Sequence, residues 1–164
     1  MKTAGLATVL AIAVGGFEFA QTDKAFQELS GLVGTWRIAG APSPGRSAFR
    51  ISYRMISADT ALVEEFGNPA KQTTETIYHR DGDNLMATHY CAQGNQPRLR
   101  LQQPNGDNAL EFRFFDATNL KSVKDSHLVR LRFEFIDGQH FKREEVYAAA
   151  GREEASSLVL ERVQ

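Results

Sequence analysis

The chain has 164 residues, which is the usual length of a single domain. It carries 19 basic and 20 acidic residues, for a formal net charge of −1, and a hydrophobic fraction of 42% that is ordinary for a globular protein. This balance disfavours binding to nucleic acid or to an anionic membrane surface. The single cysteine excludes an internal disulfide, so the fold must rely on its core.

The N-terminus has the composition of a secretory signal peptide. Lys2 gives a positive charge, and residues 4–17 form an uncharged, mostly apolar run that is too short for a bilayer, which takes about 20 residues. We predict a signal peptide over residues 1–20 and one exported domain over residues 21–164, periplasmic or secreted, with no membrane insertion after cleavage. The cleavage point stays open, because Glu18 occupies the −3 position of a cut at this boundary.

The segment after the leader predicts a short helix of about two turns. Apolar residues at three-residue spacing from Phe26 to Leu32 form one stripe, and Thr22 or Asp23 is the expected N-cap. The rest of the chain predicts about ten short strands, in the stretches LVGTWRIAG, SAFRISYRMIS, TALVEEF, TETIYHR, NLMATHYC, RLRLQ, ALEFRFF, HLVRLRFEFI, QHFKREEVYA and SLVLERV.

Alternating polarity and tight turns give the fold class. DGD between two of the strands is a strong hairpin signal, because Gly82 tolerates a positive φ. Sequential hairpins favour up-and-down order, and closing the sheet removes its exposed edges. The sequence therefore predicts an all-β protein, a single antiparallel up-and-down β-barrel of about ten strands with a short N-terminal helix.

Two motifs at opposite ends of the chain resemble the lipocalin and calycin barrels. GTW ends at Trp36, and LVLERV contains Arg162. The resemblance implies that the helix leads into a Gly-x-Trp strand and that Arg162 packs over Trp36 at a closed end. YHRDGDNL, THYCAQGNQPRL, DATNL and HF are similar to stretches in uncharacterised exported bacterial proteins of this type, which bring no activity with them. The predicted number of strands is nearer to that of fatty-acid-binding and nitrobindin-like barrels than to that of eight-stranded lipocalins.

A barrel of about ten strands is wider than its side chains readily fill, so we expect an internal cavity for a small hydrophobic or amphipathic molecule. Its aromatic wall would be formed by Tyr53, Phe112, Phe133 and Phe135.

The hairpin around Asp137 decides which polar residues line that cavity. A two-residue Asp137–Gly138 turn places His140, Lys142 and Glu144 on the interior face. A loop that differs by one residue exchanges the two faces and brings Phe141 and Tyr147 inside instead.

THYCAQGNQP is the end of one strand, a turn and the start of the next. His89 and Cys91 share a face, with Cα atoms about 7 Å apart. We expect both to contact the ligand, together with Asn95 and Gln96 at the barrel rim. The alternatives are an inert buried cysteine and an amide pair that serves only the turn.

The sequence thus predicts a non-catalytic small-ligand-binding barrel with no cofactor, no metal and no defined oligomeric state. The alternative is a small enzyme that uses His140 with Glu144, or His89 with Cys91, for acid–base or nucleophilic chemistry. A nitrobindin-like haem binder, with His140 or His127 as ligand, is the third candidate. Acid–base work by two carboxylates would need them close together, which the sequence does not show; the loosely placed candidates are Glu64, Glu65 and Glu144.

Overall fold

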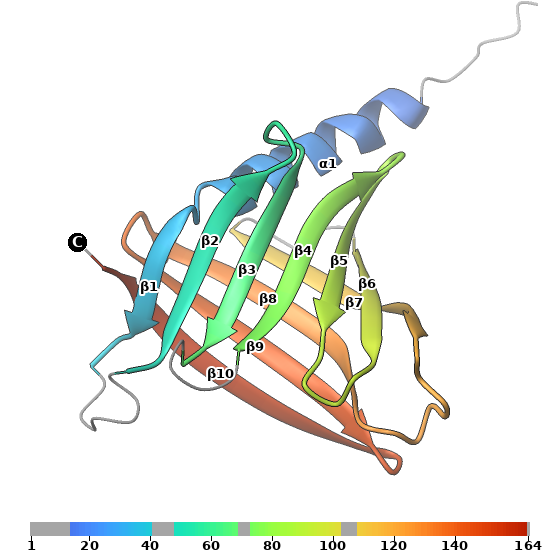
Figure 1. The fold of residues 1–164 in the computed structure, drawn as a ribbon. Helices are drawn as coiled ribbons and strands as arrows, with labels where there is room; N and C mark the ends of the chain where they lie inside the picture. The colour runs from blue at the N-terminus through green and yellow to red at the C-terminus, as the bar shows by residue number, and fades with distance from the viewer. Residues whose placement is uncertain (1–13, 41–47, 69–72, 103–107, 164) are drawn as a thin grey trace, which may run out of the picture.

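The computed structural model describes residues 14–40, 48–68, 73–102 and 108–163, with side chains from residue 22 onward. These residues form one helix and a closed antiparallel barrel of ten strands (Figure 1). The elements are α1 (Val14–Ser30), β1 (Gly34–Ile38), β2 (Arg50–Ile56), β3 (Ala61–Gly67), β4 (Thr73–Asp81), β5 (Asn84–Tyr90), β6 (Gln96–Leu101), β7 (Ala109–Thr118), β8 (His127–Asp137), β9 (His140–Ala149) and β10 (Arg152–Arg162).

Every strand pairs with its neighbours in sequence, and β1 closes the barrel against β10. The predicted fold class is therefore confirmed. Closure gives each strand two hydrogen-bonded neighbours and leaves no open sheet edge. The predicted DGD hairpin is present, with Asp81 paired to Asn84 and Gly82 at a φ of 57°.

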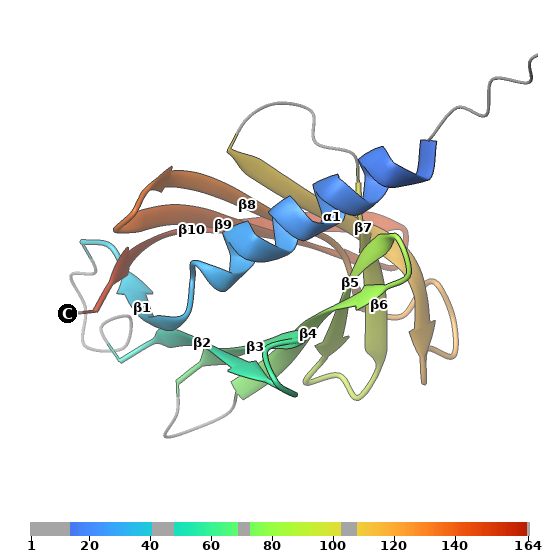
Figure 2. The ribbon, with the colours of Figure 1, turned by 90° about the horizontal axis from the view of Figure 1, so that it is seen from above.

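Helix α1 lies across one end of the barrel (Figure 2). It is longer than the sequence indicated, because it begins at Val14 and not near Thr22. Thr22 is not an N-cap: its hydroxyl donates at 2.6 Å to the carbonyl of Asp83 in the β4–β5 turn, which fixes the helix to the barrel. The predicted apolar stripe is correct, since Phe26 and Leu32 are both buried. No helix in the described ranges is long and apolar enough to cross a membrane.

The end covered by α1 is closed by Trp36 and Arg162. The Arg162 guanidinium carbon lies 4.2 Å from the centroid of the Trp36 ring, which is the contact that the Gly-x-Trp resemblance implies. Arg162 also donates to the carbonyls of Val33 and Gly31, both at 2.8 Å. The Trp36 indole donates to the Leu32 carbonyl at 2.7 Å. These bonds satisfy carbonyl groups just after the helix that have no helical partner.

The glycine of the GTW motif has a steric reason. Gly34 has a φ of 127°, and a Cβ at this position would lie 2.9 Å from Arg162 Nη1. Any larger residue would therefore be strained and would push the arginine away from Trp36.

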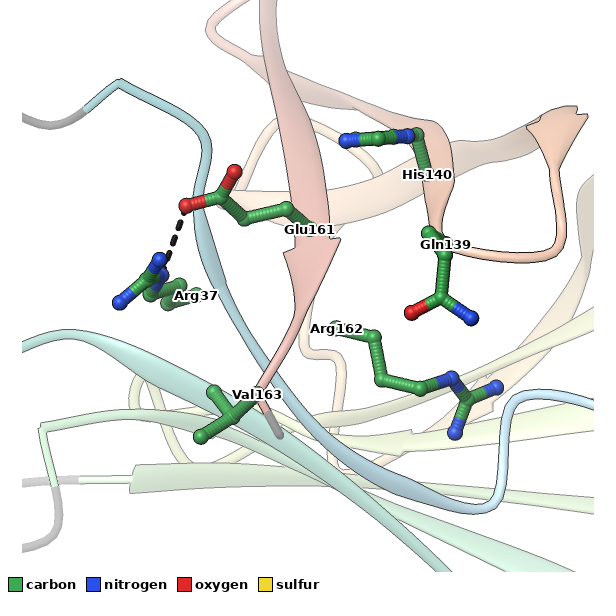
Figure 3. Close-up of a pocket in the computed structure, with 6 residues that line it drawn as sticks. All are labelled: Arg37, Gln139, His140, Glu161, Arg162 and Val163. Atoms are coloured by element: carbon green, nitrogen blue, oxygen red, sulfur yellow. Dashed lines mark hydrogen bonds and ion pairs between the residues drawn. The ribbon is translucent and has the colours of Figure 1, made fainter.

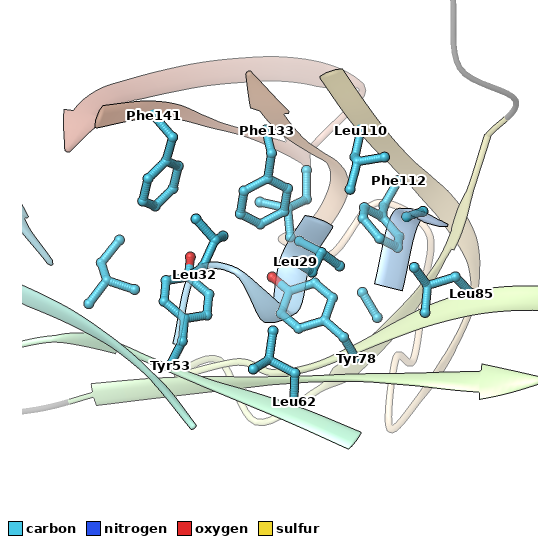
Figure 4. Packing of buried hydrophobic residues seen from close by; sticks show 14 of the residues in the cluster. Leu29, Leu32, Tyr53, Leu62, Tyr78, Leu85, Leu110, Phe112, Phe133 and Phe141 are labelled. Atoms are coloured by element: carbon cyan, nitrogen blue, oxygen red, sulfur yellow. The ribbon is translucent and has the colours of Figure 1, made fainter. Parts of the chain in front are cut away.

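The barrel half next to α1 is filled by aromatic and aliphatic side chains. Figure 4 shows Phe133 and Phe141 from one wall facing Tyr53 and Tyr78 from the other. The Phe133 ring centroid lies 6.0 Å from that of Tyr78 and 6.1 Å from that of Phe141. The predicted aromatic wall residues all belong to this cluster or pack against it: Tyr53, Phe112, Phe133 and Phe135.

The β8–β9 hairpin corrects the prediction for the interior. Phe135 pairs with Phe141 and Asp137 with His140, so Ile136 is an extra, bulged residue. Directly paired residues share a face, which places Phe141 inside together with the other odd-numbered residues of β9. The prediction that His140, Lys142 and Glu144 face the interior is wrong, because a bulge shifts the alternation by one residue.

A second bulge in β8 changes the position of His127. The register shifts between Leu128 and Arg130, and Leu128 is the residue paired with Tyr147 of β9. His127 pairs with Ala148, so it does not share the face of Phe133, where strict alternation along β8 would place it.

Candidate functional site

One row of polar side chains crosses four neighbouring strands inside the barrel. The register pairs Tyr53 of β2 with Glu64 of β3, Glu64 with Thr76 of β4, and Thr76 with His89 of β5. Because directly opposed residues project to the same face, these four side chains lie side by side in the interior. All four are buried. The row begins at Tyr53, which belongs to the aromatic cluster, and runs toward the barrel end opposite α1.

Glu64 is the most highly bonded member of the row and is fully buried. It accepts hydrogen bonds from the hydroxyls of Tyr53 and Tyr78, both at 2.8 Å. Arg143, from β9 across the lumen, binds its two oxygens at 2.7 and 3.3 Å. Burial, reinforced by the Glu64 charge, raises the pKa of Tyr53 and of Tyr78 well above the usual value. Both hydroxyls therefore stay protonated and remain donors to the carboxylate.

Arg143 links Glu64 to a second buried carboxylate. Its Nη1 forms an ion pair at 2.8 Å with Glu145, two residues further along β9, and its guanidinium carbon lies 4.5 Å from the Phe66 ring centroid. Burial opposes the positive charge, but Glu145 and Glu64 outweigh it and raise the pKa of Arg143 well above its usual value. The cluster thus contains one basic and two acidic side chains, a formal net charge of −1.

His89 joins the row to the opposite wall of the barrel. Its Nδ1 lies 2.9 Å from the Thr76 hydroxyl, and its Nε2 lies 3.1 Å from the hydroxyl of Tyr147 on β9. Either neutral tautomer satisfies both contacts, because each hydroxyl can donate or accept. Burial is the main cause that lowers the pKa of His89 below its ordinary value of 6.5. The imidazole is therefore uncharged at neutral pH.

The buried His89 predicts a loss of stability in mild acid. The unfolded chain binds a proton at this side chain below about pH 6.5, whereas the folded chain does so only at lower pH. The free energy of unfolding is therefore fully retained above this value, and His89 lowers it as the pH falls further, by up to about 1.4 kcal/mol per pH unit. Urea titrations at pH 7.5 and 5.5 measure the change.

The variant His89→Gln separates this effect from other titrations. Glutamine can bond Thr76 and Tyr147 but does not titrate, so the variant should lose less stability than the wild type between the two pH values. The control His79→Gln, on the outer face of β4, should keep the wild-type dependence. Equal losses in wild type and His89→Gln would contradict the assignment.

Cys91 and His89 each bond to other residues in the described part of the chain. Cys91 is buried, and its thiol donates to the Gln93 side chain. Both nitrogens of His89 are engaged by Thr76 and Tyr147. Burial, together with Glu145 and Cys91, raises the pKa of Tyr147. A cysteine nucleophile needs its base within hydrogen-bond reach, and here the imidazole is held by two other residues.

Asn95 lies in the turn between β5 and β6, at the barrel end opposite α1, and Gln96 is the first residue of β6. Asn95 is buried and donates to the Ser126 carbonyl at 2.8 Å, which ties this turn to the segment before β8. Its Oδ1 is buried and has no hydrogen-bond partner among the described residues. Gln96 donates at 3.0 Å to the carbonyl of Gly94, whose φ of 84° fits the predicted turn.

The other predicted pair, His140 with Glu144, lies on the outer face of β9. His140 contacts Asp137 at 2.9 Å, and Glu144 is paired with Arg130 at 2.8 Å. Four residues of extended strand separate their Cα atoms by about 13 Å, too far for joint acid–base work.

His140 contributes instead to a surface pocket at the α1 end of the barrel. Arg37 and Glu161 in its wall form an ion pair at 2.7 Å (Figure 3). The lining residues are Arg37, Gln139, His140, Glu161, Arg162 and Val163. Since these charged groups already have partners in the protein, the pocket gives no specific reason to expect a ligand.

In the described ranges, no three His, Cys, Asp or Glu side chains converge as metal ligands. Of the two histidines considered for haem, His140 lies on the outer face. His127 is buried, with Nδ1 at 2.7 Å from the Asp125 carbonyl and its ring 4.9 Å from that of Phe114.

Sequence reasoning named His89 and Tyr53 as site residues and Glu64 only as one of three loosely placed carboxylates. It missed Arg143 and Glu145, because it placed β9 in the wrong register. One signal was available for Thr76 and His89. Counting backward from the DGD turn, which pairs Asp81 with Asn84, sets Thr76 directly opposite His89. The contact between β3 and β9 across the lumen had no such local signal.

The protein is therefore a closed ten-stranded antiparallel barrel with an aromatic core and a buried, charged cluster beside it. No family model matches the chain, and no curated protein is found to be related to it.

Proposed function

We propose that the protein is a non-catalytic, lipocalin-like binding protein that holds a small, partly apolar molecule within the barrel, at the end opposite α1. The observation that carries this proposal is the polar row Tyr53–Glu64–Thr76–His89 beside the aromatic cluster. An apolar row of similar volume would often hold a barrel together as well or better, because burying charges costs several kcal/mol each before pairing. Buried, perturbed polar groups gather where proteins bind or react.

The arrangement suits an amphipathic molecule. Aromatic rings next to the row offer apolar contact, while the hydroxyls and amides near the far end offer hydrogen bonds. Both Cys91 and Asn95 of the rim turn are buried at this end, in keeping with the predicted ligand contacts. Binding alone is favoured over catalysis, since the two predicted nucleophile–base and acid–base pairs are not assembled.

Export is part of the proposal. The apolar run over residues 4–17 after Lys2 supports a signal peptide, and a cut near residue 20 retains the segment from Thr22 to Leu32 that packs against the barrel. The ligand would then be met in the periplasm or outside the cell.

The test follows the two ends of the barrel by NMR during titration with 1-octanol, an uncharged amphiphile. Trp36 is the chain's one tryptophan, so its indole N–H reports uniquely on the closed end, and the His89 ring reports on the polar row. Saturable shifts at His89 with an unchanged Trp36 signal are expected. No saturable shift, or a shift of Trp36 alone, would contradict the proposed site.

A further inference from the structure

We propose that the ligand carries a positive charge, as a protonated amine does, and that Glu145 is its counter-charge. The inference rests on the proposed function and names the ligand class for that site. It follows from which charges of the buried cluster are already neutralised and which are not.

An anionic ligand finds no free cation in the cluster. Arg143 is bound through two nitrogens to Glu64 and through the third to Glu145. A ligand carboxylate would have to displace one of these buried carboxylates and leave it unpaired, which is costly in a medium of low dielectric constant. His89 does not help, since its imidazole is neutral and both of its nitrogens have partners.

The two carboxylates differ in how well they are satisfied. Glu64 receives four hydrogen bonds, two from tyrosines and two from Arg143. Glu145 is only 8% exposed, and within the described part of the chain Arg143 is its one ion-pair partner. Among the described residues, Glu145 therefore has fewer partners than Glu64 and retains more capacity to accept hydrogen bonds.

An independent observation also calls for a donor. Asn95 is 5% exposed, and within the part of the chain that the structure describes its buried Oδ1 has no hydrogen-bond partner. Such an acceptor is normally satisfied in a native protein, by protein, water or ligand. Cys91 connects the two groups: its N–H donates to the Asn95 carbonyl at 3.1 Å, and its thiol contacts Tyr147, which lies two residues after Glu145 on β9. An ammonium group has only donors and a positive charge, so it complements both the Glu145 carboxylate and the Asn95 Oδ1.

The experiment compares three amphiphiles that share an eight-carbon chain, using isothermal titration calorimetry at neutral pH. Octylammonium should bind the wild-type protein at least about tenfold more tightly than 1-octanol, since a charged hydrogen bond exceeds a neutral one by roughly this factor. Octanoate should bind more weakly than 1-octanol because of repulsion by Glu145.

Two adjacent substitutions locate the charge. Glu145→Gln should remove the preference for octylammonium over 1-octanol. Glu144→Gln is the matched control, because Glu144 lies on the outer face with Arg130 and Lys142 and its loss should leave the preference intact. A thermal melt of each variant verifies that it is folded. If a variant does not fold, the comparison of the three ligands on the wild-type protein still tests the preference for a positive charge.

The outcomes distinguish this inference from the proposed function. Binding of 1-octanol or octanoate with no preference for octylammonium would overturn the charge assignment and leave the binding barrel intact. Absence of binding by all three would overturn the proposed function itself. A preference that survives in Glu145→Gln but disappears in Glu144→Gln would place the cation on the outer face and refute the assigned role of Glu145.

Discussion

Replacing Arg143 with methionine is expected to lower the free energy of unfolding by about 3–5 kcal/mol, the usual cost of removing one partner from a buried ion pair. The side chains of Arg143 and Glu64 are 1% and 0% exposed, so water cannot replace the lost guanidinium. Two carboxylates would remain close together in the interior with no cation between them. Urea denaturation followed by circular dichroism at neutral pH measures the loss.

Arg130→Met is the control for this prediction. Arg130 also forms a pair with a glutamate of β9, but it lies on the outer face, and the two side chains are 31% and 21% exposed. Its loss should cost no more than about 1 kcal/mol. Adding Glu64→Gln to Arg143→Met should recover part of the stability, because it removes one unpaired charge. Equal losses of unfolding free energy in Arg143→Met and Arg130→Met would contradict the buried pairing of Arg143 with Glu64 and Glu145.

Phe133→Ala is expected to destabilise the barrel to a similar degree, by about 3–5 kcal/mol. Phe133 is fully buried, and its ring centroid lies within 6.5 Å of four other aromatic rings, those of Tyr78, Phe112, Phe135 and Phe141. Truncation would remove apolar burial and leave a cavity that rigid strands on both sides cannot close. The same urea titration gives the free energy of unfolding.

Phe115→Ala provides the comparison for aromatic truncation at the surface. Phe115 is 49% exposed, and its main contact is the Arg100 guanidinium, 3.9 Å from the ring centroid. A loss of about 1 kcal/mol or less is expected. If Phe133→Ala cost as little, the aromatic cluster would not be the stabilising core that the packing indicates.

The two large effects come from adjacent parts of one interior with different roles. The aromatic cluster under α1 stabilises the fold through apolar burial. In the charged cluster of Glu64, Arg143 and Glu145, the attraction between charges roughly offsets the cost of desolvation, and stability is lost only when one partner is removed. We expect a ligand at the far end to bind Glu145 without disturbing the aromatic core.

The order of strands and the closed end could be predicted from the sequence, because their signals are local. Strict alternation in SAFRISYRMIS gives period-two strands, and Gly82 in DGD gives a tight turn. Gly34 and Trp36 follow directly on the helix, so their position at the closed end depends on short-range connection. For the same reason the inward positions of Tyr53, Phe112 and Phe133 could be read from strand alternation, whereas that of Phe141 on β9 could not.

The candidate site was decided by tertiary structure. The bulge at Val129 changes which residues of β8 face inward, and the bulge at Ile136 shifts the inward face of β9 by one residue. A bulge needs no distinctive residue type. The bulge at Ile136 places His140 and Glu144 on the outer face and Arg143 and Glu145 on the inner face.

The pair at the centre of the site also joins residues 79 positions apart in the chain. Glu64 and Arg143 meet only because the closed sheet brings β3 and β9 to opposite walls of one lumen. The sequence determined which residues form strands, through local periodicity and turn chemistry. Barrel closure and strand register determined which charged side chains are buried together, because those depend on contacts that no short stretch of the chain contains.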